Sequence, residues 1–578
     1  MRKVLAAALL LALAACGGGG GGGSGAGGSS GSGSGGGSGS APPSQPVAPT
    51  ASEASRFLTQ ATFGPTTSSI SAVRSAGYGG WITQQLSASS PSTHLSYLDA
   101  RLTALQASNP QATLNPNHFY ESWWRQAVTG PDELRQRVAF ALSQIFVISL
   151  VDPNVDVRGA GAYYDLLSRN AFGNYRTLLE EVSLNPMMGR YLTFLANQKE
   201  DTAGTRTPDE NYAREVMQLM TIGLWELNPD GTQRLNAQGQ PIATYTPADI
   251  AGLAKVFTGI SWYHPTPTNT TFFGANRDPN REVRAMIFYP QYHSTSEKVF
   301  LGTTIPASTT VDMAGDLRIA LDRLFNHANV GPFIAQRLIQ QLVTSNPSPA
   351  YVGRVAAVFN NNGSNVRGDL GAVIRAVLTD AEAREAATAA GASFGKLREP
   401  VVRVTNWARA FGATSTSGNW LITSTSANTS LGQTPLASPS VFNFWRPGFV
   451  PPGTTQLGSR GLLAPEFQIV DEVTVAGYVN TINNTINAGI GSSNDVRAVY
   501  TAELALADNA DQLVDHVALL LAPDQMSATL RTRVLAGVNA IAIPPAGSTQ
   551  TQIDTARLNR VKSAILFVMA SPDYLAQR

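Results

Sequence analysis

Apolar residues recur at helical spacing along most of the chain. In the segment 132–149, five of them fall on one stripe of a helix: Leu134, Val138, Ala141, Leu142 and Ile145. Comparable spacing, with Pro, Gly or Asn at many of the boundaries, predicts further helices over residues 118–129, 176–184, 186–196, 209–227, 248–257, 313–326, 332–344, 349–360, 369–379, 398–411 and 558–570. The pattern therefore predicts a mainly α protein.

Two stretches depart from this helical pattern. Residues 234–245 contain the turn Gln238-Gly239 and predict a small β-hairpin. Residues 259–302 are irregular and rich in aromatic residues, and we expect a loop-rich insertion with short strands. No repeat of fixed period and no second low-complexity linker interrupts residues 51–578, so a single large helical domain is expected there, with two lobes as the alternative.

The first residues predict a secretory signal peptide. Arg2 and Lys3 precede the apolar run Val4–Leu13, which at about ten residues is shorter than the roughly 20 that span a bilayer. Small residues follow this run, as they do at a signal-peptide cleavage site. We therefore expect residues 1–15 to be removed on export.

The single cysteine of the chain lies where lipid processing needs one. The stretch Leu13-Ala14-Ala15-Cys16 resembles the bacterial lipobox, and that resemblance implies cleavage before Cys16 and acylation of its thiol. An incidental cysteine in an ordinary signal peptide is the alternative. By the same resemblance, Gly17 in place of aspartate implies sorting to the outer membrane. Residues 16–50 are expected to be a disordered Gly/Ser/Pro tether that follows the lipidated cysteine.

Composition narrows the possible partners. The 578 residues include 41 Lys+Arg and 40 Asp+Glu, and this balance argues against a nucleic-acid partner. Arginine outnumbers lysine by 35 to 6, and guanidinium groups suit planar anions. The arginines are scattered along the sequence, however, so a GC-rich genome is the simpler explanation of their number.

The densest group of charged candidates lies at the start of the predicted helix 209–227. Glu210 and Arg214 have the i, i+4 spacing of a structural ion pair. In the functional alternative, Glu210 or Glu215 is a general acid/base and Arg214 holds a substrate anion.

His293 and Lys298 lie five residues apart in the irregular segment. A loop histidine can be a general base or a metal ligand, but it is more often a hydrogen-bonded structural residue. The six histidines include no HExxH or HxH pair, which argues against a zinc site. The match to G-x-S-x-G at Gly391–Gly395 follows a helical stretch instead of the strand that a nucleophile elbow needs. Because the histidine spacing argues against a metal site, we expect no metal, and we expect no cofactor either.

Aromatic residues concentrate in the same irregular segment. They are Trp262, Tyr263, Phe272, Phe273, Phe288, Tyr289 and Tyr292. Such rings in loops can line a groove for a carbohydrate or another polymer, or they can pack beneath the loops.

Several motifs in a fixed order carry a family resemblance. They are Arg56-Phe57-Leu58, Ala61-Thr62-Phe63-Gly64-Pro65, Asp209-Glu210-Asn211-Tyr212-Ala213-Arg214-Glu215, Gly223-Leu224-Trp225, Leu301-Gly302, Arg367-Gly368-Asp369-Leu370 and Lys396-Leu397-Arg398-Glu399-Pro400-Val401. Over residues 54–575 the chain resembles the bacterial family called domain of unknown function 1800. Members usually have His-Asp-x-Gly-x-Lys where this chain has Ser294 after His293. The resemblance implies no activity, but genes of members often neighbour one for an exported phosphatase-like protein, which makes such a protein an expected partner.

Two hypotheses of function follow. In the first, the protein is an exported bacterial lipoprotein of the outer membrane or cell surface, held to the membrane by its lipid. Its helical body then binds an extracytoplasmic polymer, such as a polysaccharide, or a partner protein. In the second, it is a hydrolase of an envelope or extracellular substrate. Glu210, Glu215 and His293 are then the acid/base candidates, Arg214 holds an anion, and Lys298 lies beside the site.

Overall fold

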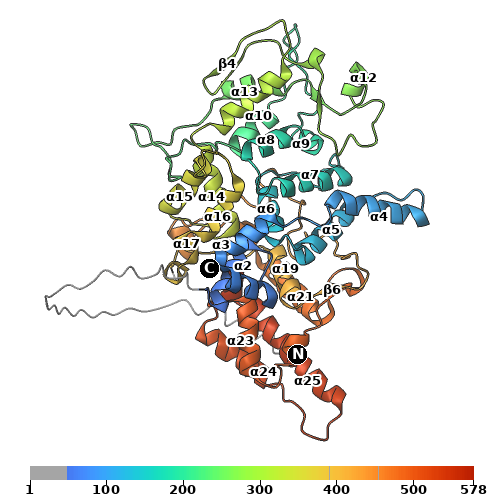
Figure 1. The fold of residues 1–578 in the computed structure, drawn as a ribbon, viewed down its shortest axis with the longest axis vertical. Helices are drawn as coiled ribbons and strands as arrows, with labels where there is room; N and C mark the ends of the chain where they lie inside the picture. Colours follow the sequence, from blue (N-terminus) through green and yellow to red (C-terminus); the bar gives the residue numbers. More distant parts are fainter. Residues whose placement is uncertain (1–47, 390, 454) are drawn as a thin grey trace, which may run out of the picture. The chain divides into compact units, whose positions relative to one another are not determined.

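The computed structural model describes residues 48–389, 391–453 and 455–578, and Ala48–Arg578 make up one compact unit (Figure 1). The predicted signal peptide, Cys16 and most of the predicted tether lie outside the described residues. Within the described ranges, no helix combines the length and the apolar character that crossing a membrane requires.

Helices make up most of this unit, which confirms the predicted mainly α class. The helices are α2 (Ala51–Ala61), α3 (Thr67–Ser87), α4 (His94–Ser108), α5 (Pro116–Thr129), α6 (Glu133–Ser143), α7 (Val157–Arg169), α8 (Tyr175–Ser183), α9 (Pro186–Tyr191), α10 (Asn211–Gln218), α11 (Pro247–Ala254), α12 (Asn269–Phe272), α13 (Met313–Phe325), α14 (Val330–Leu342), α15 (Pro349–Asn360), α16 (Leu370–Thr379), α17 (Ala381–Arg384), α18 (Ala386–Ala389), α19 (Pro400–Ala410), α20 (Gln456–Ser459), α21 (Glu472–Ala488), α22 (Thr501–Leu504), α23 (Ala510–Leu521), α24 (Ala528–Asn539), α25 (Gln550–Met569) and α26 (Pro572–Leu575).

The strands are short and pair two by two, and each pair is antiparallel. They are β1 (Ile260–Ser261) with β2 (Ile287–Phe288), β3 (Lys298–Phe300) with β4 (Thr303–Ile305), β5 (Lys396–Leu397) with β8 (Ala576–Gln577), and β6 (Thr414–Ser415) with β7 (Val496–Arg497). The predicted loop-rich segment therefore contains β1, β2 and β3, and the first pair joins the start of the segment to residues 287–288. The predicted hairpin also forms, as an isolated bridge between Leu235 and Pro241 around the Gln238-Gly239 turn.

Local capping signals fix many of the helix starts. At α2, the Thr50 hydroxyl accepts the Glu53 amide N–H, and the Glu53 carboxylate accepts the Thr50 amide N–H. This capping box satisfies two of the amide groups that a helix start leaves without partners. Proline occupies the first turn of α5, α9, α11, α15 and α19, where its missing N–H costs no helical hydrogen bond.

Helix ends depart from the predictions more than helix starts do. The predicted helix 209–227 is much shorter in the structure, because α10 ends at Gln218. Gly223 adopts a φ of +71°, and its N–H donates to the Met217 carbonyl, which closes the helix end as glycine commonly does. The predicted helices 132–149 and 186–196 also end early, at Ser143 and Tyr191.

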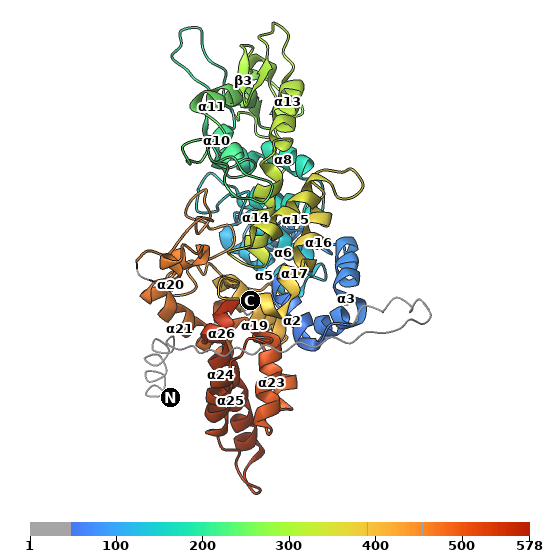
Figure 2. The same ribbon diagram turned by 90° about the vertical axis from the view of Figure 1, so that its left-hand side faces the viewer.

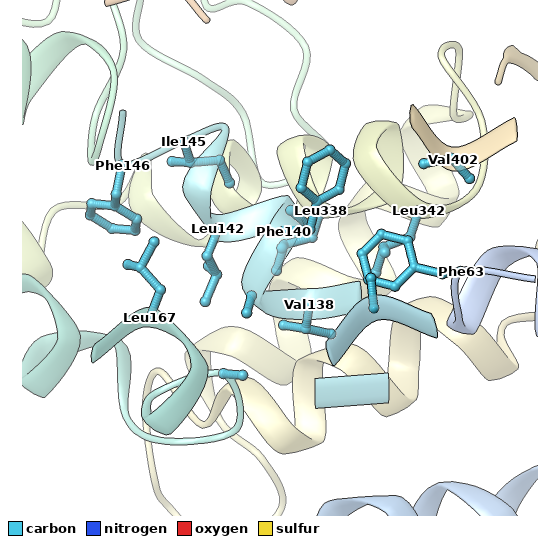
Figure 3. Packing of buried hydrophobic residues seen from close by; sticks show 14 of the residues in the cluster. Phe63, Val138, Phe140, Leu142, Ile145, Phe146, Leu167, Leu338, Leu342 and Val402 are labelled. Atoms are coloured by element: carbon cyan, nitrogen blue, oxygen red, sulfur yellow. The ribbon is translucent and has the colours of Figure 1, made fainter. Parts of the chain in front are cut away.

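The apolar stripe of α6 lies at the centre of the core. Figure 3 shows Val138 and Leu142 of α6 in one cluster with Leu167 of α7 and Leu338 of α14, and all four side chains are buried. Figures 1 and 2 place α8, α10, α11, α13 and β3 at one end of the unit and α23, α24 and α25 at the opposite end. The candidate residues of the loop-rich segment therefore lie at the α10–α13 end.

Candidate functional site

Two of the predicted site residues form a surface ion pair. Arg214 Nη2 lies 3.3 Å from Glu210 Oε2, and both side chains are 45% exposed. The preceding Asp209 holds the start of α10, because its carboxylate accepts the Asn211 amide N–H at 2.8 Å. Glu210 and Arg214 thus make the i, i+4 contact that their spacing predicts.

Glu215 faces the interior from the same helix. Its side chain is buried, and Oε2 has no hydrogen-bond partner within the described part of the chain. Burial raises the pKa of the Glu215 carboxyl, and the nearby charge of Arg214 opposes this rise only in part. A buried carboxyl with a raised pKa suits a general acid, because it holds its proton more readily than an exposed carboxyl. Its ionised form lowers the stability of the fold.

His293 is enclosed in a buried polar cluster. Its Nδ1 donates to the Thr258 carbonyl oxygen at 2.8 Å, and its Nε2 lies 2.9 Å from Asp316 Oδ2. Lys298 Nζ lies 2.9 Å from the same carboxylate oxygen and donates to the Ser294 carbonyl at 2.7 Å. We call His293, Lys298 and Asp316 the histidine cluster. Both ring nitrogens already have partners, so neither is open to a substrate.

Asp316 is the residue of this cluster that the sequence did not reveal. It lies in the first turn of α13, 23 residues after His293. Burial alone would raise the pKa of its carboxyl, but hydrogen bonds from His293 and Lys298 outweigh burial and hold that pKa below its usual value. The carboxylate therefore ties β3 and the preceding loop to α13.

A second carboxylate lies next to Ser294, the position where family members usually have aspartate. The hydroxyls of Ser294 and Ser296 both donate to Glu200 Oε1, the first at 2.8 Å. The hydrogen bond from Ser296 is the main counterweight to burial, and it helps to lower the pKa of the Glu200 carboxyl. A carboxylate from a distant segment thus occupies the neighbourhood of the missing aspartate.

The structure does not join the predicted acid/base residues into one constellation. His293 makes no hydrogen bond or ion pair with Glu210 or Glu215 within residues 48–389. Instead, Asp316 brings His293 and Lys298 together, and Arg214 pairs with Glu210.

Most of the loop aromatics pack against one another. Trp262, Phe272 and Tyr289 are buried. Phe272 stacks on Tyr292 with ring centroids 3.9 Å apart, and the Tyr289 hydroxyl donates to the Trp262 carbonyl at 2.8 Å. Phe273 is the exposed member, at 58%. These rings thus stabilise the loops by packing against one another.

Arginine side chains lie against two of these aromatic rings. Arg190 of α9 and Arg281 lie against the ring of Trp262, at 4.7 Å and 4.3 Å from its centroid, and Arg284 lies 4.5 Å from that of Tyr263. Gly274 permits this packing, because its φ is +87° and a Cβ there would lie 3.2 Å from Arg281 Nη1. These cation–π contacts hold guanidinium groups in fixed positions.

The charges of these arginines are only partly balanced. Glu282 Oε1 pairs with Arg277 at 2.9 Å and with Arg281 at 3.1 Å. Arg190 and Arg284 make no ion pair within the described residues, and burial together with the neighbouring Arg281 lowers the pKa of Arg190. We call Arg190, Arg277, Arg281 and Arg284, with Trp262 and Tyr263, the arginine patch.

The arginine patch departs from the expectation of scattered arginines. Three of its members lie within eight residues of sequence, at 277, 281 and 284, and this local density was the available signal. Arg190 joins them only through the fold. The exposed side chain of Arg277, at 60%, shows that the patch is open to solvent.

A third polar cluster lies deep in the unit, where α14 ends. Lys396 Nζ lies 3.0 Å from Glu466 Oε1 and donates to the Gln341 carbonyl at 2.9 Å, and Arg137 donates to that same carbonyl at 2.8 Å. Glu399 accepts amide hydrogen bonds from Gln144 and Gln433. A cavity of about 10 Å³ adjoins these amides, which is room for about one water molecule. Its size suits structural hydration.

Comparison with known proteins identifies a family. A family model described as "Protein of unknown function (DUF1800)" matches residues 56–576. This match confirms the resemblance carried by the motifs. A search of curated proteins and a search of solved structures each returned no match.

Proposed function

The chain belongs to the family described as Protein of unknown function (DUF1800), and we propose that it is an envelope-anchored lipoprotein whose helical body binds an anionic extracytoplasmic polymer at the arginine patch. The polymer class is a polysaccharide bearing carboxylate, phosphate or sulfate groups. The observation that carries the proposal is a group of four guanidinium groups, of which two pair with the carboxylate of Glu282 and two make no ion pair within the described residues.

The geometry of the patch suits a repeating anionic ligand. Its arginines come from α9 and from the segment between α12 and β2, so their charges spread over a surface. Arg277 and Arg284 are exposed, while Arg190 and Arg281 are fixed against Trp262. Guanidinium groups present paired N–H donors that match carboxylate and phosphate oxygens. Ordered donors lose less conformational entropy on binding than free side chains do.

A polyuronate and its carboxyl-reduced, neutral counterpart test the proposal with matched probes. The full-length protein should bind the charged polymer and not the neutral one, and binding should weaken as salt screens the charges. The double variant Arg277→Gln/Arg284→Gln should lose about tenfold in affinity, which corresponds to roughly 1.4 kcal/mol. The matched control is Arg531→Gln/Arg557→Gln, which removes two partly exposed arginines of α24 and α25. Equal losses in both double variants, or equal binding of both polymers, would contradict the proposal.

The lipid anchor is the second part of the proposal. It is supported by the lipobox-like sequence before Cys16 and by the position of the only cysteine in the chain. Radiolabelled palmitate should appear on the wild-type protein and be absent from Cys16→Ala. If the wild-type protein carried no label, the proposed lipid anchor would be wrong. The proposed polymer site would be unaffected by that result.

A partner protein is the other branch of the binding hypothesis. If the patch captured an exported phosphatase-like protein and not the polymer, the ligand of the patch would be that protein. The same double variants decide whether the capture depends on the arginines.

A hydrolase is the second candidate function, and one observation favours it. Glu215 is a buried carboxyl with a raised pKa, which is typical of a general acid, and its Oε2 has no hydrogen-bond partner in the part of the chain that the structure describes. Reducing ends released from the polyuronate by wild-type protein, lost in Glu215→Gln and kept in Glu210→Gln, would establish this activity. A rate equal to the buffer blank would end this candidate.

A further inference from the structure

Two guanidinium groups meet between α2 and α17, far along the sequence from the arginine patch. The Arg56 side chain is 4% exposed, and its Nη2 donates to the Arg384 carbonyl oxygen. Arg384 Nη2 donates to Gln60 Oε1, and Gln60 is fully buried. The three residues therefore form one connected group.

Four nitrogen atoms of this group lack an acceptor among residues 48–389, 391–453 and 455–578. They are Arg56 Nη1, Arg384 Nε, Arg384 Nη1 and Gln60 Nε2, and all four are buried. Neither arginine makes an ion pair within the described residues. An unsatisfied buried donor costs about 1–3 kcal/mol, and more when it is charged. The group thus presents several donors and net positive charge; the neutral Tyr78 hydroxyl accepts a hydrogen bond from Arg384, but no carboxylate pairs with either arginine within the described residues.

The polar cluster at the end of α14 shows why it matters that all the unpartnered atoms beside Arg56 are donors. Its unpartnered atoms include donors, Arg137 Nε and Nη1, and an acceptor, Glu466 Oε2. Water satisfies such a mixed set, because each molecule donates and accepts. Its charges also balance, since Lys396 pairs with Glu466. Beside Arg56, water could accept the N–H groups, but it would leave the positive charge in place.

Aromatic rings hold Arg384 without neutralising it. Its guanidinium lies 5.2 Å from the ring centroid of Phe57 and 5.5 Å from that of Tyr78. Burial and the neighbouring charge of Arg56 lower the pKa of Arg384 to about 10, so Arg384 stays charged at neutral pH. The guanidinium of Arg56 is charged there too, because arginine side chains keep their proton in proteins. The nearest acids act elsewhere: Glu53 caps α2 with Thr50, and Asp524 is exposed.

We propose that Arg56, Arg384 and Gln60 form a binding site for a small oxyanion, that is, a phosphate or carboxylate group. The oxyanion accepts hydrogen bonds from the nitrogens that lack an acceptor; a phosphate dianion compensates both positive charges, and a carboxylate compensates one of them. The site is independent of the arginine patch and of the polymer that the patch is proposed to bind. A negative result in the polymer-binding experiment would therefore leave the proposed oxyanion site unaffected.

Thermal unfolding of the full-length protein tests the site with inorganic phosphate. At constant ionic strength, replacing chloride by phosphate should raise the Tm of the wild type, and the rise should continue with the logarithm of the phosphate concentration above the Kd. Arg384→Gln should remove the part of the rise that depends on this site, while the controls Arg531→Gln and Arg277→Gln/Arg284→Gln should keep that part. A wild-type Tm that is the same in both salts, or an undiminished rise in Arg384→Gln, would overturn the proposal.

Parallel measurements of the Tm in acetate and in phosphate identify the class of oxyanion. A rise with acetate as large as with phosphate assigns a carboxylate site, and a rise with phosphate alone assigns a phosphoryl site. Asp524→Asn shows whether the chain's own carboxylate fills the site, because removing it should then strengthen the response to phosphate. If Arg384→Gln fails to fold, wild-type crystals soaked in arsenate give the answer directly. Anomalous density within hydrogen-bond distance of Arg56 and Arg384 supports the site, and its absence there overturns it.

Discussion

The histidine cluster and the arginine patch lie in the same part of the fold but solve opposite electrostatic problems. In the histidine cluster, His293 and Lys298 share the carboxylate of Asp316, and all three side chains are mostly buried. In the arginine patch, Glu282 pairs with only two of the four guanidinium groups, and the patch is open to solvent. The first arrangement is complete without a ligand. The second leaves positive charge available to one.

This difference shows that residue type alone is a poor guide to a site. A histidine next to a lysine is an attractive pair for catalysis, yet here a buried carboxylate saturates both side chains. Arginines are common in this chain, and no single arginine stands out in the sequence. Their value as a binding surface depends on which of them lack a carboxylate partner. The predictions below test the closed nature of one cluster against the open nature of the other.

The largest expected effect is on the histidine cluster. Asp316→Asn keeps the side-chain shape but removes the charge that faces Lys298 and His293. Breaking a buried pair costs about 3–5 kcal/mol, and because Asp316 keeps some exposure we expect a loss of about 3 kcal/mol in the free energy of unfolding. Denaturant unfolding measures it. The exposed pair supplies the control, since Glu210→Gln should cost less than about 0.5 kcal/mol. Similar small losses in both variants would mean that the cluster is not a closed structural unit.

The contribution of Asp316 should also depend on pH. The pKa of its carboxyl in the folded protein lies below the unfolded value of about 3.9. Its contribution to stability is therefore fully present above about pH 4 and is lost as the pH falls through the folded pKa. The gap in unfolding free energy between wild type and Asp316→Asn should narrow as the pH is lowered from 7 toward 2. A gap that stays constant would contradict the assigned ionisation.

Glu215 should show the opposite dependence. Its folded pKa lies above the unfolded value of about 4.3, so its favourable contribution is present below that pH and is lost as the pH rises through the folded pKa. Glu215→Gln should therefore stabilise the protein at pH 7 by about 1 kcal/mol, the usual scale for an unsatisfied buried polar group. At pH 4 the two proteins should be nearly equal. Denaturant unfolding at both values checks the sign, and destabilisation at pH 7 would sink the prediction.

The smallest effect on stability should come from the arginine patch. Arg277→Gln removes an exposed side chain, so its unfolding free energy should stay within about 0.5 kcal/mol of wild type. Its polymer affinity should nevertheless fall, and the dependence of affinity on salt should become weaker. Titrations at two salt concentrations, together with denaturant unfolding, separate the two outcomes. A large loss of stability would show that the patch is structural, like the histidine cluster.

The accuracy of the sequence predictions follows the range of the interactions involved. The start of α11 at Thr246-Pro247 was predictable because the cap and the proline are neighbours in sequence. The end of α10 was missed because Gly223 ends the helix through its conformation, which the apolar pattern does not encode. The predicted stripe residues that lie in α6 are buried, as expected from helical spacing, but most other residues of α6 are buried as well, which the spacing did not predict.

The candidate site was predicted less well, because its residues find partners over long distances. The i, i+4 pair of Glu210 and Arg214 was visible from spacing, whereas no spacing rule links His293 to Asp316. Arg190 lies 91 residues before Arg281, and the ring of Trp262 joins them. Local density at residues 277–284 was the part of the patch that the sequence displayed.

The sequence by itself determined the helical class, the family and the local caps, because these depend on residues within a few turns of one another. The expectation of a lipid anchor at Cys16 also comes from the sequence alone. Only the tertiary structure decided which charged side chains are neutralised and which are not. The free energy of a charge depends on its burial and on the opposite charges within a few ångströms, and folding sets both. That is why the same residue types form a closed cluster around Asp316 and an open patch around Trp262.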